Sequence, residues 1–362
     1  MKKHLHNLNL IWLRKSCYLF ASLLCIQIAG CVKHDIHFPL HRYQQVNLVS
    51  DVDEYNAMRI DKSLSNAWGI AVSPTGIIWI SANHTGLSTI YDKDGNTVLA
   101  PVLIPAHEWH NVGSPTGQVF NGTSGFVIPS TNVISRFIFA SEDGVISAWA
   151  PGSTAAVIVK DRNAEEAVYK GITMANDGTG NFLYVANFKG GKIEVFDSNF
   201  HRVTNKPFRD PSIPAGFAPF NIKNIDGKLY VLYAKQKGPD NEDDEPGVGN
   251  GYVNIFTPGG SLIGRFASKG PLNSPWGIIK DTNGFCSLRD AILIGNFGDG
   301  RINVYDQFGI FQGQLQGGGQ TIAIDGLWAL ENQIMGADPN RLYFTAGPDD
   351  EQHGLFGYLE RK

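Results

Sequence analysis

The sequence is poor in cysteine and in charge, and each shortage narrows what the chain can be. Of its 362 residues only four are cysteine and 18% are charged. Cys17, Cys25 and Cys31 all lie in the first 31 residues, so only Cys286 remains for the rest of the chain and we expect no intrachain disulfide. We interpret Cys286 as a structural residue. Basic residues form no cluster beyond the N-terminus, which argues against nucleic-acid binding.

The short motifs of common catalytic sites are also missing. The chain has no G-x-S-x-G elbow, no CxxC pair and no phosphate-binding or dinucleotide loop. HEWH, His107–His110, resembles the zinc motif HExxH. Its histidines are three residues apart instead of four and lie in a loop rich in Pro and Gly, so they do not match two zinc ligands on one helix face. We interpret HEWH as a surface loop.

Glycine and aromatic residues are plentiful, and they occur in a repeated pattern. There are 41 glycines, and aromatic residues make up 11% of the chain, a composition typical of turn-rich all-β proteins. VANFKGGKIEVFDSNF (185–200) is echoed in register by IGNFGDGRINVYDQFG (294–309). Diverged copies of this phrase recur along the chain, and each copy follows a strand-like run. The chain is therefore a repeat protein.

Six repeat units can be aligned on one residue near the start of the first strand of each unit. These anchor residues, spaced 48 to 56 positions apart, are Trp68, Thr116, Lys170, Phe220, Trp276 and Trp328. Each of the first five units contains four β-prone segments separated by Gly, Asp and Asn turns. Six units of four strands predict an all-β fold, a six-bladed β-propeller.

The sixth unit lacks a fourth strand, because the sequence stops at Lys362 soon after its third. Tyr43–Ser50 is an alternating β segment that precedes the first unit and has no partner of its own. We expect this N-terminal strand to complete the last blade, which removes two open sheet edges at once.

The first thirty residues predict export. Lys2, Lys3 and two further basic residues precede an uncharged apolar run, Ser16–Gly30. Such a run indicates a secretory signal and is too short for a comfortable membrane span. It ends in IAGC, a bacterial lipobox in which Cys31 becomes the lipidated first residue. The alternatives are an uncleaved anchor, or an ordinary signal followed by a chance cysteine. We predict a lipoprotein signal peptide over 1–30, a tether over 31–41 and the propeller over 42–362.

Collinear motifs over nearly the whole mature chain resemble an uncharacterised bacterial family of exported propeller proteins. They include NAWGIA (66–71), SPTGQVFNG (114–122), GNFGDGRINVYD (295–306) and LYFTAGPDDEQHGLFG (342–357). The resemblance implies the fold and export, and it assigns neither a reaction nor catalytic residues. By similarity to Gram-negative lipoproteins, Val32 in place of Asp favours sorting to the outer membrane.

Polar residues at two places in each blade are candidates for a binding site. The start of the innermost strand and the end of the second strand face the same mouth of the central channel, the usual ligand site of propellers. Polar side chains expected there suit hydrogen bonds to a polar organic ligand. The candidates are Asn83, Glu142, Asn187, Asn221, Lys235 and Asn296.

Structural roles compete with binding at several of these positions. An Asn that ends a strand before a Gly turn commonly satisfies backbone groups of the loop, and we favour that role for Asn83, Asn187 and Asn296. For the anchor tryptophans we favour packing between blades over stacking on a ligand.

Calcium binding is the main alternative. Six-bladed lactonases and gluconolactonases hold Ca²⁺ at this mouth with Glu, Asn and Asp side chains, but amides outnumber carboxylates among the candidates here. Two acidic loops, 239–247 and 347–354, follow second strands. In the first, Asp240, Glu242, Asp243 and Asp244 are candidate calcium ligands, although they do not match the EF-hand spacing and such runs are usually solvated.

These observations favour a lipid-anchored envelope propeller that acts as a ligand- or protein-binding or scaffold module, with no catalytic activity assigned. We expect a membrane partner through the lipid, an unknown protein or polar small molecule as ligand, and a monomeric domain with no certain cofactor. A Ca²⁺-dependent hydrolase or lactonase is the alternative, and a purely structural envelope protein is the third possibility.

Overall fold

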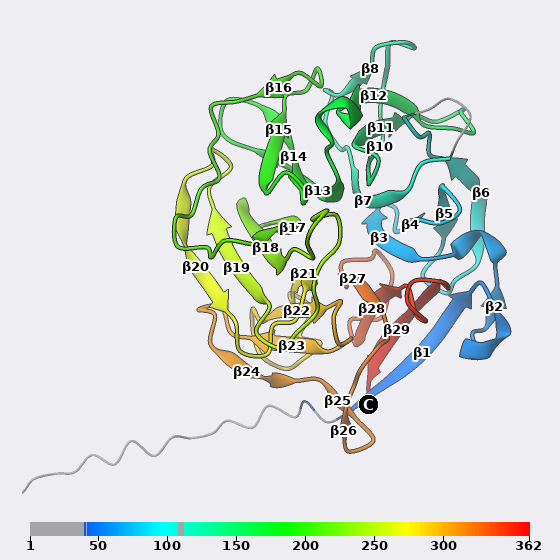
Figure 1. The fold of residues 1–362 in the computed structure, drawn as a ribbon. Helices are drawn as coiled ribbons and strands as arrows, with labels where there is room; N and C mark the ends of the chain where they lie inside the picture. The colour runs from blue at the N-terminus through cyan, green and yellow to red at the C-terminus, as the bar shows by residue number, and fades with distance from the viewer. Residues whose placement is uncertain (1–39, 41, 108–111) are drawn as a thin grey trace, which may run out of the picture. The chain divides into compact units, whose positions relative to one another are not determined.

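The computed structural model describes residue 40, residues 42–107 and residues 112–362, and within them the fold is almost entirely β-structure. The strands of this part of the chain form six sheets of four or five strands around a central axis (Figure 1). The innermost strands are β3 (Ala67–Val72), β7 (Pro115–Phe120), β13 (Tyr169–Asn176), β17 (Phe217–Ile225), β21 (Pro275–Lys280) and β27 (Leu327–Glu331). The predicted six-bladed propeller is confirmed.

Each of the first five blades adds three antiparallel strands outside its innermost one. Blade 1 has β4 (Ile78–Ala82), β5 (Leu87–Tyr91) and β6 (Thr97–Leu103), and blade 2 has β10 (Phe137–Ser141), β11 (Val145–Trp149) and β12 (Val157–Asp161). Blade 3 has β14 (Asn181–Asn187), β15 (Lys192–Phe196) and β16 (Arg202–Val203), and blade 4 has β18 (Lys228–Lys235), β19 (Gly251–Phe256) and β20 (Leu262–Ser268). Blade 5 has β22 (Ile292–Asn296), β23 (Ile302–Tyr305) and β24 (Phe311–Gln314). The repeated phrase is therefore the second and third strands of blades 3 and 5.

The sixth blade closes the ring with the N-terminal strand, as predicted. Outside β27 it contains β28 (Arg341–Ala346), β29 (Leu355–Arg361) and β1 (Tyr43–Ser50). Strand β1 pairs antiparallel with β29, from Tyr43 opposite Arg361 to Ser50 opposite Leu355. A short fifth strand, β2 (Arg59–Ile60), runs parallel to the end of β1 and was not predicted.

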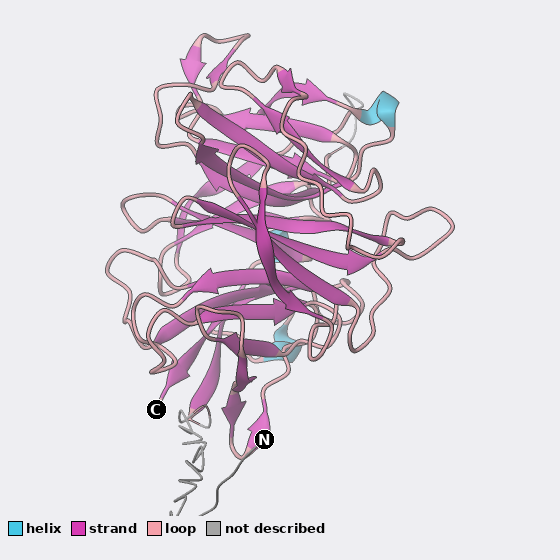
Figure 2. Ribbon diagram, turned by 90° about the vertical axis from the view of Figure 1, so that its left-hand side faces the viewer, coloured by secondary structure: helices cyan, strands magenta, loops and turns pink. Residues whose placement is uncertain are grey.

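The remaining elements decorate the blades. Two hairpins, β8 (Val127–Ile128) with β9 (Val133–Ile134) and β25 (Gln316–Gly317) with β26 (Gln320–Thr321), form small sheets of their own. The helical turns are 3₁₀ turns, η1 (Asp53–Tyr55), η2 (Lys62–Leu64) and η3 (Asn163–Glu165). In a view at right angles to the first, the loops gather at the two ends of the strands (Figure 2). Over the described ranges, no helix has the length and apolarity needed to cross a bilayer.

Aromatic and β-branched residues of the second and third strands fill the space between neighbouring blades. Trp79 of β4 is 2% exposed and stacks on Phe137 of the next blade, with ring centroids 3.9 Å apart. Burying a side chain of this size stabilises the fold by roughly 2–3 kcal/mol. Because a blade has a neighbour on each side, both faces of its central strands are buried, and these strands read as continuous apolar runs.

Candidate functional site

The six anchor residues lie in β-bulges at the start of the innermost strands. In every blade the register between the first and second strand shifts at the anchor, for example between Tyr169 and Gly171 in blade 3. A bulge re-aims the side chain it contains. The shared position of the anchors in the repeat therefore has a structural cause.

The aromatic anchors meet and close the channel at this end. Trp68 and Trp328 stack with centroids 3.7 Å apart, and Trp276 meets both edge-on. Phe297, which follows the strand-end Asn296, stacks on the other face of Trp328 at 3.9 Å. We call this group the aromatic plug. The anchor tryptophans do pack between blades, as favoured, and two of them, Trp68 and Trp328, also form the floor of a cavity.

Directly beyond each anchor, the innermost strands come close together. The residues there are Gly69, Gly117, Gly171, Asn221, Gly277 and Ala329. A Cβ atom on Gly171 would lie 2.1 Å from Oδ1 of Asn221, so only glycine fits without displacement at that point. The channel centre holds a cavity of only about 30 Å³. Channel and plug together make the mouth a blind pocket.

The pocket above the plug has a volume of about 310 Å³, and we call it the anchor-mouth pocket. Both acidic loops predicted from the sequence contribute to its wall. Its lining residues are Trp68, Lys170, Lys237, Asp243, Asp244, Pro246, Phe297, Gly298, Asp325, Gly326, Trp328, Gly347, Asp350 and Glu351.

Lys170 is the only anchor with a charged side chain, and its ammonium group is almost fully buried. Nζ donates to Glu142 Oε1, lies 3.4 Å from Asp243 Oδ1 and sits 5.3 Å from the centroid of the Trp68 ring. Asn83 Nδ2 donates to the other oxygen of Glu142 at 2.9 Å. Burial opposes the charge of Lys170, but Glu142 and Asp243 outweigh burial and raise the pKa of the ammonium above its ordinary value. Lys170 is therefore a fixed cation in the wall of the pocket.

Glu351 faces Lys170 from the other acidic loop. Its Oε2 accepts a hydrogen bond from Asn66 Nδ2 at 2.6 Å, and Asn66 Oδ1 accepts one from the Trp328 indole at 3.0 Å. Burial raises the pKa of the Glu351 carboxyl to about 7, although Lys170 and the bond from Asn66 act in the opposite direction. Glu351 can therefore gain or lose a proton near neutral pH while it faces the pocket.

Sequence comparison places the chain in a family. Uncharacterized protein L690 of Acanthamoeba polyphaga mimivirus is 37% identical to the chain over 318 residues, 84% of this chain and 82% of the viral protein. The chain belongs to the L690 family. Uncharacterized protein R648 of the same virus is 34% identical over 314 residues, 84% of this chain and 76% of that protein. No family model matches the sequence. These relatives are viral, so the bacterial origin stays a prediction.

Solved propellers share the fold at low sequence identity. A virginiamycin B lyase from Staphylococcus aureus superposes with a TM-score of 0.53 at 12% identity, covering 89% of this chain and 99% of the lyase. A soluble aldose sugar dehydrogenase from Escherichia coli gives 0.53 at 13%, covering 88% and 100%. A putative gluconolactonase gives 0.52 at 15%, covering 83% and 89%. At such identities the likeness shows the fold alone.

Several of the predicted binding residues lie at strand ends but do not line the anchor-mouth pocket. Asn187 is buried, and its Oδ1 accepts the backbone N–H of Gly190 at 2.9 Å. Asn296 is fully buried; its Nδ2 donates to Oδ1 of Asp299 in its own turn at 3.0 Å and to the carbonyl of Pro271 at 2.8 Å, whereas its Oδ1 has no partner among the described residues. Lys235 forms an ion pair with Glu245. In this L690-family propeller the asparagines therefore make the turn contacts expected of a structural role.

Asn221 lies deeper than predicted. It occupies the position that is glycine in four of the blades and lines the narrow channel centre instead of the pocket. Its Nδ2 donates to the carbonyl of Trp276 at 2.8 Å, and its Oδ1 accepts the N–H of Ile222. Asn221 therefore links the innermost strands of blades 4 and 5.

The four candidate calcium ligands of the first acidic loop do not converge on one point. Asp240 is exposed, Glu242 pairs with Lys189 at 2.9 Å, Asp243 faces Lys170, and Asp244 is buried. Within the described ranges, no three His, Cys, Asp or Glu side chains are grouped closely enough to hold a metal ion. Of the four candidates, Asp243 and Asp244 line the pocket, and the loop forms no ligand shell.

The calcium site of the enzymatic propellers does not fit the residues of this mouth either. Both carboxylate oxygens of Glu142 already accept N–H donors, one from Lys170 and one from Asn83. Asn83 presents its amide nitrogen, not its oxygen, to that carboxylate. An ammonium beside Glu142 repels a divalent cation. The ammonium of Lys170 therefore occupies the position beside Glu142 where a calcium ion would need to bind.

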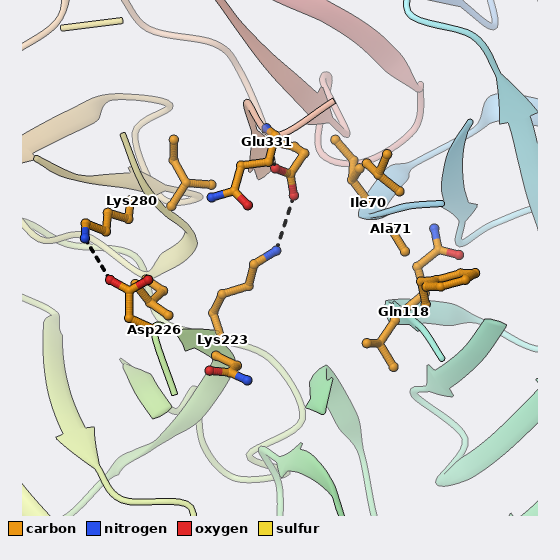
Figure 3. A pocket seen from close by; sticks show the side chains of 14 residues that line it. Ile70, Ala71, Gln118, Lys223, Asp226, Lys280 and Glu331 are labelled. Atoms are coloured by element: carbon orange, nitrogen blue, oxygen red, sulfur yellow. Dashed lines mark hydrogen bonds and ion pairs between the residues drawn. The ribbon is translucent and has the colours of Figure 1, made fainter. Parts of the chain in front are cut away.

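The opposite mouth of the channel holds a second cavity, of about 400 Å³. Lys223 extends across it toward Glu331, with Nζ 3.4 Å from Oε2, and Lys280 pairs with Asp226 at 2.7 Å (Figure 3). Each lysine there is matched by a carboxylate. The anchor mouth differs because it contains an excess of acid and buried polar atoms without partners, and we regard it as the better candidate.

Sequence reasoning missed the residues that define the pocket. The sequence pattern places Lys170 and the loop that contains Glu351 at this mouth, but it does not select either residue as a binding candidate, and it gives no sign of Phe297. The signal for Lys170 was available, since it is the only charged residue among six aligned anchors. Cys286 lies in the core, where burial raises the pKa of its thiol to about 12. Cys31 and His110 lie outside the described residues.

Proposed function

We propose that this propeller is a lipid-anchored envelope protein that binds a small polar ligand in the anchor-mouth pocket. The observation that most supports ligand binding is a blind pocket of about 310 Å³ with an aromatic floor, in which seven of the fourteen lining residues carry ionisable side chains. Ligand sites of proteins commonly combine an apolar surface with a small number of fixed polar groups. Lys170 and Glu351, held by Glu142 and Asn66, are positioned before any ligand arrives.

A ligand screen with a blocked variant tests the binding proposal. Pro246 is exposed on the pocket wall, so Pro246→Trp places an indole in the opening without disturbing the plug. A set of cationic, anionic and neutral polar compounds is screened by thermal unfolding of the wild-type chain and the variant. We expect at least one compound to raise the wild-type Tm by several degrees and to have no effect on Pro246→Trp. If every compound acts alike on both proteins, the pocket is not the binding site.

Anchoring is tested separately, through Cys31. We expect the wild-type chain to fractionate with membranes and Cys31→Ser to appear in a soluble fraction when expressed in a Gram-negative host. Metabolic labelling with a fatty acid adds a direct readout of lipidation. Unchanged membrane fractionation of Cys31→Ser would contradict lipidation at this residue.

The competing function is a Ca²⁺-dependent hydrolase or lactonase. The fold likeness to a putative gluconolactonase favours it, and the ammonium of Lys170 beside Glu142 opposes it. Metal analysis of the purified chain, with thermal melts in EDTA and in Ca²⁺, separates the two. We expect equal Tm values in both, and a Ca²⁺-dependent rise of several degrees would favour the hydrolase.

A further inference from the structure

The anchor-mouth pocket contains more acid than base. Its two lysines are Lys170 and Lys237, and Lys170 is already neutralised by Glu142 and Asp243. The carboxylates of the lining belong to Asp243, Asp244, Asp325, Asp350 and Glu351. A ligand that enters the pocket therefore meets a negative field, which strengthens as water is displaced.

Asp244 is the most buried carboxylate of the pocket lining. It is only 8% exposed, it lines the pocket, and its Oδ2 has no hydrogen-bond partner among the described residues. Burial raises the pKa of this carboxyl, although the hydroxyl of Ser274, which is close enough to turn toward Asp244 and has no other partner among the described residues, and Lys170 act against the rise. A buried carboxylate is costly unless donors surround it, and a ligand ammonium that reaches the part of Asp244 lining the pocket lowers that cost.

The turn that carries Glu351 is held in an unfavourable backbone conformation. Asp349, Asp350 and Glu351 have φ values of 57°, 50° and 66°, so three consecutive non-glycine residues are left-handed. Each such residue costs roughly 1–2 kcal/mol relative to a right-handed one. The turn is stabilised by the N–H of Asp349 donating to Asp325 Oδ2 at 2.9 Å. Strain of this kind gathers at functional sites, and here it places two carboxylates at the pocket.

The spacing of these carboxylates selects the type of cation. A metal ion needs several oxygen atoms within about 2.5 Å of one point, and no such acidic group exists in the described part of the chain. Separated carboxylates instead match separated ammonium groups on one molecule. Phe297, half-buried at the outer end of the aromatic plug, offers a ring to the methylene groups between them or to an ammonium itself.

We propose that the anchor-mouth pocket binds an elongated organic cation with two or more amino groups, such as a linear polyamine. Asp244 accepts one ammonium at the buried end, and Asp350 with Glu351 accepts another at the rim. The aliphatic segment lies over Phe297. This inference rests on the proposed binding function and names the class of its ligand.

Calorimetric titration with three probes of similar length tests the proposal: spermidine, the neutral 1,8-octanediol and the dianion suberate. We expect spermidine to bind at least about tenfold more tightly than either other probe, since one charge-assisted hydrogen bond contributes roughly 1.5 kcal/mol or more. Spermidine affinity should fall as salt rises. It should also weaken as the pH falls below about 7, where Glu351 takes up a proton.

Two variants and a matched control locate the site. Asp244→Asn keeps the shape of the buried side chain, and Asp350→Asn changes an exposed residue to one that tolerates the left-handed conformation. Each should weaken spermidine binding about tenfold by removing one ion pair. Asp240 is exposed, belongs to the same acidic loop as Asp244 and does not line the pocket, so Asp240→Asn should leave spermidine binding unchanged.

The outcomes separate this inference from the proposed function. Binding of octanediol or suberate without spermidine overturns the polyamine assignment and leaves the pocket as a binding site. Equal effects of Asp350→Asn and Asp240→Asn overturn it too, because they indicate diffuse attraction to a negative surface. The binding proposal itself falls only if Pro246→Trp responds to every compound as the wild-type chain does.

Discussion

Replacing the buried cation Lys170 tests how the wall of the pocket is held. In Lys170→Met the apolar stem is kept and the ammonium is lost, which leaves Glu142 without its strongest partner. The Lys170 side chain is 4% exposed and that of Glu142 27%, so the Glu142 carboxylate regains only part of its hydration. The Asp243 side chain is 73% exposed and is hydrated when Lys170 is lost, so its ion pair with Lys170 contributes little to the free energy of unfolding. We therefore expect Lys170→Met to lower the free energy of unfolding by about 2–4 kcal/mol.

The double variant is the decisive measurement. Lys170→Met with Glu142→Gln leaves no buried unpaired charge at this position, and it should be less destabilised than the sum of the two single variants. A double-mutant cycle should return a coupling energy of about 2 kcal/mol. Urea unfolding followed by tryptophan fluorescence and by circular dichroism gives the four free energies, provided that the two probes coincide.

An ion pair at the opposite mouth provides the control. Lys280 and Asp226 lie 2.7 Å apart, but their side chains are 22% and 67% exposed. Their cycle should give at most about 0.5–1 kcal/mol. If the Lys170–Glu142 coupling is no larger than that, Lys170 is not the buried cation that stabilises the pocket wall, and the argument against a calcium site weakens with it.

Four further perturbations test the fold and the site. Native Glu351 keeps its proton up to about pH 7, whereas unfolded Glu351 loses it near its ordinary pKa of 4.5, so the free energy of unfolding should fall as pH rises between these values. Glu351→Gln should flatten this part of a plot of Tm against pH. If the plots of the wild-type chain and the variant run parallel, Glu351 is not the titrating group. Asn187→Ala should cost about 1–2 kcal/mol in urea unfolding and leave ligand affinity unchanged, whereas a loss of affinity alone would return Asn187 to the binding site. Gly171→Ala should lower Tm by several degrees because its Cβ meets Asn221, and an unchanged Tm would show that the strands can separate. Deleting residues 43–50 should abolish cooperative unfolding, and a sharp transition in the shortened chain would refute ring closure by β1.

The repeat made the architecture predictable from sequence. Anchors such as Trp68 and Trp276 recur at blade spacing because each marks the bulge that begins an innermost strand. The missing strand of the last unit and the spare segment at Tyr43 predicted the closure. Short additions such as β2 were not predictable, because two-residue strands depend on a loop finding an edge and leave no periodic pattern.

The site was less predictable because it depends on contacts between blades. Asn187 and Asn83 occupy equivalent strand ends, yet one satisfies its own loop and the other reaches Glu142 of the next blade. Asn66 and Glu351 are 285 positions apart in sequence and meet only through ring closure. The left-handed residues of the turn at Asp349 are not glycines, so the sequence does not indicate this backbone conformation. The position of the acidic loops after second strands predicted that acidic residues lie at the mouth. Only the three-dimensional arrangement shows which of their carboxylates face the pocket.

Ring closure by β1 also sets an order of events during folding. The first strand of the propeller pairs with the last, Tyr43 with Arg361, so this sheet cannot be completed until residues 43–361 have all left the ribosome. Closing so large a loop is entropically costly, and contacts of this range slow folding. Until then both edges of the nascent ring remain open to pairing with other chains. A chain that loses its last ten residues should therefore be prone to aggregation even though five blades are intact.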